Sequence, residues 1–217
     1  MGMTRVRVFA VVASVLAVGL VGYALTAPRG ERSIRQFEPD RLADLELRMW
    51  QAYYAKENVR LFGLLVAMLR EQYHYSWATA VREGFHLARA AATFGNLRGN
   101  YDVVIPDLEA AYGTAQSWLD AGFDPKAVAR AELAWWVARR IPGQNDPTQV
   151  GGLIADEYAM LYEAPRPAVA RSALLRAEAA ALRDAQAERP DWTTIGTMLR
   201  DSYRDLHAGL SRPHGGS

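Results

Sequence analysis

The segment DPKAVARAELAWWVARRIPG, residues 124–143, decides the fold class. Asp124 suits the position before a helix, because its carboxylate can accept a hydrogen bond from a free N–H of the first turn. Pro125 suits the first turn, where its missing N–H costs no hydrogen bond. Pro142 and Gly143 then end the element. The segment therefore predicts a capped α-helix.

The same pattern of capping residues and prolines at helix starts recurs along the chain. Asp146-Pro147 precedes GGLIADEYAMLY, Pro106 precedes DLEAAYGTAQSWL, and Ser76 and Asp191 can cap two further helices. The expected helices cover residues 41–73 with a bend near Asn58, 77–94, 106–119, 125–141, 147–162, 166–188 and 192–210. No stretch alternates apolar and polar residues over strand length. We therefore expect an all-α fold, an antiparallel bundle of helical hairpins with about seven helices.

The stretch RVRVFAVVASVLAVGLVGYALTAPRGER, residues 5–32, raises a separate question of location. Residues 8–25 are almost wholly apolar and would span about 27 Å as a helix, close to the ~30 Å hydrocarbon core of a bilayer. Tyr23 suits the membrane interface. A retained anchor is the favoured interpretation. A cleaved signal peptide, with small residues at Gly22 and Ala24, and an N-terminal core helix are the alternatives.

These observations give a domain plan: an anchor or signal segment over residues 1–27, a linker over 28–38, a helical domain over 39–211 and a flexible tail over 212–217. Arginines flank both sides of the apolar run, so the charge rule decides orientation only weakly. We expect a single span in a bacterial inner membrane, with the body on the exported, periplasmic side. The expected partners are membrane lipid, through residues 8–25, and another membrane-associated protein.

Composition excludes several classes of function. The 217 residues include 25 Lys and Arg against 24 Asp and Glu, and part of the basic excess flanks the apolar run. The body is therefore slightly acidic, which is a poor match for nucleic acid, and no nucleic-acid partner is expected. The absence of cysteine excludes disulfides and thiolate metal ligands.

One hairpin, about residues 83–116, carries a family resemblance. Ala91 and Ala92 are small where two helices would touch, Gly99-Asn100-Tyr101 stands at the turn, and Leu108 and Ala111 hold second-helix core positions. This pattern resembles a tetratricopeptide unit, although Val104 replaces the usual alanine and the first-helix aromatic, Phe94, is displaced by one position. The resemblance implies stacked hairpins with an interaction surface and no chemistry.

Two E-x-x-H sequences are the first candidate for chemistry. Residues three apart share a helix face, so a Glu and a His at this spacing can bind one metal ion. Di-iron bundles use two such pairs plus single glutamates from other helices. The candidate ligands are Glu71, His74, Glu83, His86, Glu46 and Glu132. The alternative is that they are ordinary neighbours on helix surfaces, and no cofactor is expected.

Glu132 is a second candidate because it lies one turn before Trp136. A carboxylate on an aromatic face is often partly buried and then needs a cation or hydrogen-bond donors. It would take part in either an interhelical ion pair or a ligand-facing polar pocket. The adjacent tryptophans point in different directions, so Trp135 or Trp136, with Arg139 and Arg140, can form a partner surface.

Three functional hypotheses follow. The chain contains no G-x-S-x-G, P-loop or G-x-G-x-x-G pattern, so an enzyme is not the favoured class. The first hypothesis is a membrane-anchored interaction module, a scaffold or accessory subunit of a larger complex. The second is a metal-binding, di-iron-like bundle. The third is a binder of lipid or a small apolar ligand, with Trp135, Trp136 and Tyr158 lining a gap of roughly 300 Å3 or more.

Overall fold

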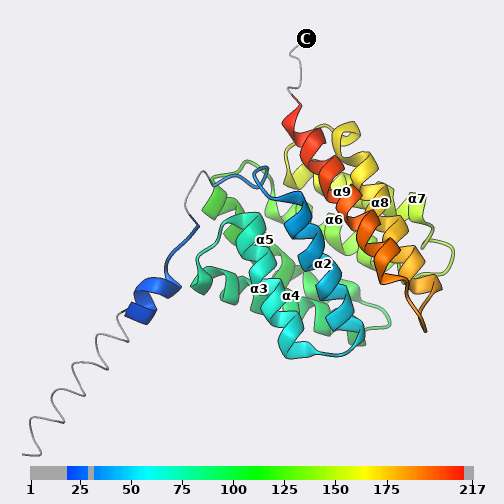
Figure 1. Cartoon of the computed structure of the whole chain (residues 1–217), viewed down its shortest axis with the longest axis horizontal. Helices are drawn as coiled ribbons and strands as arrows, with labels where there is room; N and C mark the ends of the chain where they lie inside the picture. The colour runs from blue at the N-terminus through cyan, green and yellow to red at the C-terminus, as the bar shows by residue number, and fades with distance from the viewer. Residues whose placement is uncertain (1–18, 29–31, 213–217) are drawn as a thin grey trace, which may run out of the picture.

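A computed structural model describes residues 19–28 and 32–212 of the chain, and within these ranges every regular element is helical (Figure 1). This confirms the all-α fold class. The elements are α2 (Pro39–Tyr54), α3 (Asn58–Tyr73), α4 (Trp77–Asn96), the 3-10 helix η1 (Tyr101–Val104), α5 (Ile105–Leu119), α6 (Pro125–Ala138), α7 (Pro147–Leu161), α8 (Arg166–Ala185) and α9 (Trp192–Ser211).

Helix starts follow the capping residues that the sequence indicates. The side chain of Ser76 accepts a hydrogen bond from the Thr79 N–H at the start of α4. Asp124, Asp146 and Asp191 accept bonds from backbone N–H groups in the first turns of α6, α7 and α9. Each cap satisfies donors that a helix leaves free at its N-terminus. The predicted starts of these four helices are therefore confirmed.

The expected single helix over residues 41–73 is instead two helices, α2 and α3. Lys56 adopts a left-handed conformation, with φ 60°, immediately after α2. The Glu57 N–H donates to the Ala52 carbonyl at 2.9 Å, and the Lys56 N–H donates to the Tyr53 carbonyl at 3.1 Å. These bonds close the last turn of α2 in the way that left-handed residues end helices. The chain therefore reverses where only a bend was expected.

The helices form a closed ring. Each helix from α2 to α9 packs against the next one along the chain, and α9 packs back against α2. The connections are short, which favours antiparallel neighbours. Arg204 of α9 forms an ion pair with Asp40 of α2 at 2.7 Å across this closing contact. The ring surrounds a shared interior to which nearly every helix contributes side chains.

Small residues allow the second half of the ring to pack closely. A Cβ atom added to Gly151 of α7 would lie 2.9 Å from Cα of Leu174 in α8. A Cβ atom at Gly209 of α9 would overlap the carbonyl oxygen of Ala168 in α8. Between α8 and α9, the buried Ser202 hydroxyl donates to the Ser172 carbonyl at 2.9 Å. These close contacts therefore fix how α7, α8 and α9 pack against one another.

The segment before α2, expected as a linker, packs on the bundle. Ile34 and Phe37 are buried in the core, and Phe37 lies edge-on to Tyr203. The Arg35 guanidinium donates to the backbone carbonyls of Tyr162 and Glu163, both at 2.7 Å. The part of this segment that the structure describes is thus an integral part of the domain.

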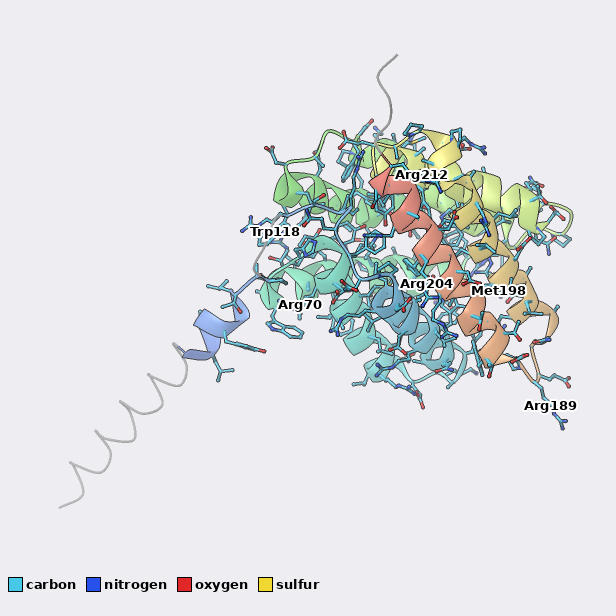
Figure 2. All side chains as sticks on the ribbon, turned by 45° about the horizontal axis from the view of Figure 1, so that its top comes forward. Arg70, Trp118, Arg189, Met198, Arg204 and Arg212 are labelled. Atoms are coloured by element: carbon cyan, nitrogen blue, oxygen red, sulfur yellow. The ribbon has the colours of Figure 1, made fainter. Side chains whose placement is uncertain are left out.

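Residues 19–28 lie beside one end of the bundle, near Arg70 (Figure 2). The guanidinium of Arg70 stacks 4.1 Å over the ring of Trp77, and its Nη1 donates to the Thr26 carbonyl at 3.3 Å. The rings of Tyr23 and Trp77 lie 6.4 Å apart. These contacts join the end of the apolar run to α3 and α4.

The expected membrane span falls mainly on residues that are not described. Of the helices within 19–28 and 32–212, none has the length and apolar character needed to cross a bilayer. Residues 8–18 of the proposed span lie outside the described part of the chain. The anchor and the signal peptide therefore both stay predictions.

Candidate functional site: an acidic cavity inside the ring

A cavity of about 150 Å3 lies in the interior of the ring. Side chains from every α-helix between α3 and α9 line it. The cavity therefore forms only when the ring is assembled, because no single hairpin supplies its wall. The polar and charged side chains that line it are Gln72, Tyr73, Tyr75, Glu83, Tyr112, Glu132, Glu157, Tyr158, Tyr162, Arg176 and Tyr203. Leucines, Met68, Ala111 and Trp135 supply the apolar wall. An apolar cavity of this size in another protein accommodates a benzene molecule.

Two carboxylates meet in this cavity at one hydroxyl group. The hydroxyl of Tyr112 on α5 lies 2.9 Å from Oε2 of Glu132 on α6 and 3.3 Å from Oε1 of Glu157 on α7. The second oxygen of Glu157 accepts a 2.5 Å hydrogen bond from the indole Nε1–H of Trp135. Glu157 is 6 % exposed. One phenol hydrogen thus serves two acidic groups, which leaves an excess of acceptors over donors.

Burial raises the pKa of both carboxyl groups. The pKa of Glu157 rises to about 8, because desolvation and the nearby Glu132 charge oppose its ionisation. Desolvation likewise raises the pKa of Glu132 to about 7, and the Tyr112 hydrogen bond, the Arg176 charge and a Trp136 hydrogen bond oppose that rise. The pair therefore holds a proton near neutral pH, as closely spaced carboxyl groups in a low-dielectric site do.

Arg176 of α8 is the cation nearest to the pair, and it is already engaged. Its Nη2 lies 2.7 Å from Oε1 of Glu46 on α2, and its Nε donates to the same oxygen at 2.9 Å. Its guanidinium also lies 5.0 Å from the ring centre of Trp135. Glu46 is 3 % exposed, so this is an interhelical ion pair in the core. It joins α2, the helix whose own residues do not line the cavity, to the site.

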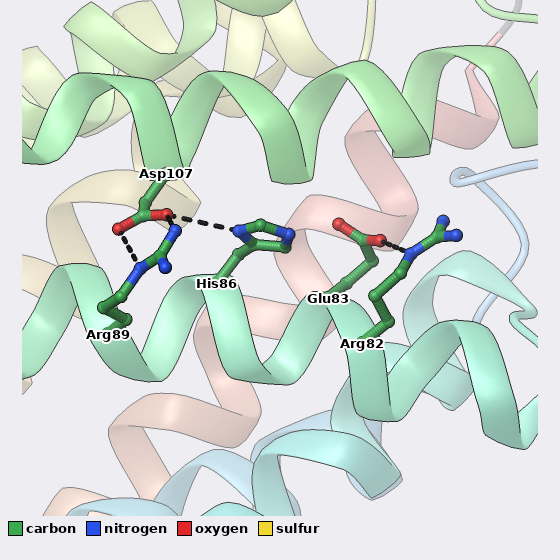
Figure 3. A network of polar contacts seen from close by, with 5 residues as sticks. All are labelled: Arg82, Glu83, His86, Arg89 and Asp107. Atoms are coloured by element: carbon green, nitrogen blue, oxygen red, sulfur yellow. Dashed lines mark hydrogen bonds and ion pairs between the residues drawn. The ribbon is translucent and has the colours of Figure 1, made fainter.

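Glu83 of α4 adds a third carboxylate to the cavity wall. It is 1 % exposed, and its Oε1 accepts a 2.7 Å hydrogen bond from Arg82, whose side chain reaches it from the surface. Its Oε2 has no hydrogen-bond partner among the described residues. Figure 3 shows Glu83 with Arg82, separate from His86 with Asp107. A buried oxygen without a donor is costly, so this oxygen is available to accept a hydrogen bond from a molecule in the cavity.

Tyrosines complete the wall as neutral phenols. Burial raises the pKa of Tyr73, Tyr112, Tyr162 and Tyr203 well above the usual range. The Gln72 side chain donates to the Tyr162 hydroxyl at 2.8 Å and so fixes one side of the cavity. Faces of neutral aromatic rings attract cations.

The E-x-x-H residues take part in separate interactions. Glu71 pairs with Arg41 at 2.5 Å, and His74, in a left-handed conformation after α3, bonds through Nε2 to the Ser33 and Gln36 carbonyls. His86 bonds to Asp107, which also binds Arg89 (Figure 3). Among the described residues, no three histidine and acidic side chains are grouped closely enough to hold a metal ion.

The four residues expected at a partner surface lie in contacts within the domain. Trp135 is buried in the cavity wall, and Trp136 lies partly buried against Phe94, with ring centres 5.1 Å apart. Arg139 pairs with Asp184 at 2.7 Å. Arg140 stacks 3.8 Å from the Phe94 ring centre and donates to the Phe94 carbonyl.

Of the residues singled out from the sequence, Glu83, Glu132, Trp135 and Tyr158 line the cavity and Glu46 lies behind its wall, whereas Tyr112, Glu157 and Arg176 were missed as members of this site. Glu157 has a recoverable signal. In GGLIADEYAMLY it lies three residues after Ile154 and four before Leu161, on an otherwise apolar helix face. An acidic residue on such a face is buried when the helix packs, and it then needs a partner.

The arrangement can hold a small ligand, exchange a proton with it, or do both. It combines carboxyl groups that titrate near neutral pH, fixed phenol and indole donors, and a cavity large enough for a small molecule. Perturbed titrating groups around a cavity are typical of functional sites. Comparison with known proteins adds no family to this description, since no protein-family model, curated protein or solved structure matches the chain.

Proposed function

We propose that the helical ring is a small-molecule-binding module and that the interior cavity is its binding site. One observation carries this proposal: a cavity of about 150 Å3 is lined by three glutamates. Interiors of proteins are normally close-packed and apolar, and burying carboxylates reduces stability unless they are paired. A space lined by such groups is accounted for by a ligand that uses them.

The size and lining of the cavity favour a small polar ligand over lipid. The lipid hypothesis called for roughly 300 Å3, and the cavity has about half that volume. Trp135 and Tyr158 line it, whereas Trp136 packs against Phe94 and is not part of the lining. A lipid chain in the cavity would also remove water from the carboxylates in the wall without replacing its hydrogen bonds, which costs free energy.

The cavity can be tested directly with a panel of small ligands. Benzene, n-butanol, n-butylammonium and butyrate are titrated into the full-length chain in detergent, and the indole N–H signal of Trp135 is followed by NMR. At least one ligand should shift this signal in a saturable manner. Ala111→Leu, which adds bulk to the cavity wall, should abolish the shift while the far-ultraviolet circular dichroism stays helical. The proposal fails if no ligand saturates the signal, or if Ala111→Leu binds as well as the wild type.

A second proposed function is the membrane-anchored scaffold or accessory subunit. It is supported by the apolar run over residues 8–25 and by the Arg70 contact with Thr26, which joins the end of that run to the bundle. Carbonate washing of membranes should leave the full-length chain in the pellet, and crosslinking should recover a membrane-associated partner. Release of the intact chain into the wash would contradict the anchor.

A further inference from the structure

We propose that the cavity binds a small organic cation with a primary ammonium group, a molecule of about six heavy atoms. This inference rests on the proposed function and names the ligand class for the same site. Four features of the described residues support it: unmatched acceptors, net negative charge, aromatic walls and size.

The cavity contains acceptors without donors. Oε2 of Glu83 has no partner among the described residues although the side chain is buried. Glu132 and Glu157 share the single hydroxyl hydrogen of Tyr112, and each has one indole donor besides, Trp136 for Glu132 and Trp135 for Glu157, so their four oxygens meet only three donor hydrogens. A primary ammonium group brings three N–H donors and no acceptor, so it supplies what these oxygens lack. A ligand anion would add acceptors to a site that already has too many.

Charge favours a cation for a related reason. Three carboxylates line the cavity, and the one guanidinium that lines it, Arg176, is bonded to Glu46 behind the wall. Arg82 reaches Glu83 from the surface, but the Glu132–Glu157 pair has hydrogen-bond donors and no cation of its own. A monocation would therefore allow both carboxyl groups of the pair to ionise despite their burial.

The aromatic walls favour an organic cation over a metal ion. Trp135 and tyrosines including Tyr73 and Tyr158 line the cavity, and their ring faces attract ammonium groups. A bound metal ion requires several oxygen or nitrogen atoms within about 2–2.6 Å of one point. No group of three acidic or histidine side chains among the described residues is arranged in that way. An ammonium group needs only hydrogen-bond distances to acceptors on different walls.

The decisive experiment compares three probes of similar size on the full-length chain in detergent at pH 8.5. These are n-butylammonium, uncharged n-butanol and tetramethylammonium, which is a cation without N–H donors. Trp135 reports binding through its indole N–H, which donates to Glu157, and Trp135→Phe assigns the signal. We expect n-butylammonium to bind at least 10-fold more tightly than either other probe.

Variants then locate the binding. Glu157→Gln should weaken n-butylammonium binding at least 10-fold and leave n-butanol binding within 2-fold. If Glu157→Gln reduces the folded fraction, Glu132→Gln removes a carboxylate from the same pair and is used in its place. Glu71→Gln is the matched control, because Glu71 pairs with Arg41 and does not line the cavity. It should bind all three probes as the wild type does.

The outcomes separate the ligand class from the proposed function. Equal binding of n-butanol and n-butylammonium would contradict the proposal that the ligand is a cation, but it would still support a ligand-binding function. Tighter binding of tetramethylammonium would overturn the primary ammonium group. Binding of n-butylammonium that neither glutamine variant weakens would place the cation outside the cavity and overturn the inference. Absence of binding by any probe, including the neutral ones, would overturn the proposed function as well.

Discussion

Glu132 and Glu157, on neighbouring helices, share one hydrogen-bond donor, the hydroxyl of Tyr112. A phenol has one hydrogen to donate, so two ionised carboxylates cannot both be well served by it. The second carboxyl group is satisfied when it is itself protonated and donates to the phenol oxygen. The fold thereby determines how the pair is protonated, and the first three predictions rest on this relationship.

Stability should fall as the pH rises from about 5 to 8.5. Glu132 and Glu157 have pKa values raised to about 7 and about 8 in the folded chain, against 4.5 in their unperturbed state. Between these values the folded chain binds more protons than the unfolded chain, so rising pH favours unfolding. The free energy of unfolding, from urea denaturation, should drop by on the order of 1 kcal/mol per pH unit in this window.

Glu157→Gln removes one member of the pair and should flatten that dependence. The variant should be more stable than the wild type at pH 8.5 and nearly equal to it at pH 5. Glu71→Gln, which alters an ion pair at the surface, should keep the wild-type slope. A wild-type stability that rises across the same window would contradict the assigned burial of the pair.

Tyr112→Phe should destabilise the domain more at pH 8.5 than at pH 5.5. The hydroxyl lowers the pKa of both glutamates by hydrogen bonding, so its loss raises those values further and makes ionisation costlier. The expected loss at high pH is about 1–3 kcal/mol. Carbon-13 NMR of the glutamate carboxyl groups would measure the upward shift. Tyr53→Phe, at an exposed position, is the control and should change neither quantity.

The domain should tolerate loss of the whole Glu46–Arg176 pair better than loss of the arginine alone. Arg176→Met leaves a buried carboxylate without its cation, and we expect a cost of about 3–5 kcal/mol. Adding Glu46→Leu should recover more than half of that loss in denaturant titrations. Arg60→Met, which breaks the exposed pair with Glu57, should cost no more than about 1 kcal/mol.

Gly209→Ala should destabilise the contact between α8 and α9. Its methyl group would overlap the Ala168 carbonyl, so the two helices must separate, at a cost of about 1–3 kcal/mol. Gly95→Ala is the matched control, because Gly95 lies in α4 and an added Cβ meets nothing within 4 Å. It should be neutral or stabilising by about 0.5–1 kcal/mol. Thermal unfolding of the two variants tests the difference, and equal melting temperatures would count against the close approach.

The helices could be predicted from the sequence because their signals are local. The side chains of Ser76, Asp124, Asp146 and Asp191 bond to backbone two or three residues away. The break at Lys56 was harder to predict, because lysine has no special preference for the left-handed conformation that it adopts there.

The site could be predicted only in part because its contacts are distant in sequence. Glu132 was recognised as a carboxylate on an aromatic face, but Arg176 lies 130 residues from its partner Glu46. Tyr112 is 45 residues from Glu157. Ring closure determines which side chains meet, and the helical periodicity of a single chain does not reveal which helices are neighbours. The two E-x-x-H sequences are likewise a local pattern. They predict shared metal ligands, but in the fold their residues contact separate partners.

Closure by α9 has a consequence for how the molecule is made. Asp40, near the start of the domain, and Arg204, near its end, are 164 residues apart and bind each other directly. A polypeptide still emerging from the ribosome cannot complete the enclosure until its final 20-residue helix is available. A chain truncated before residue 192 would therefore keep the sequence of α2 to α8 yet lack both the closing ion pair and the Tyr203 part of the cavity wall.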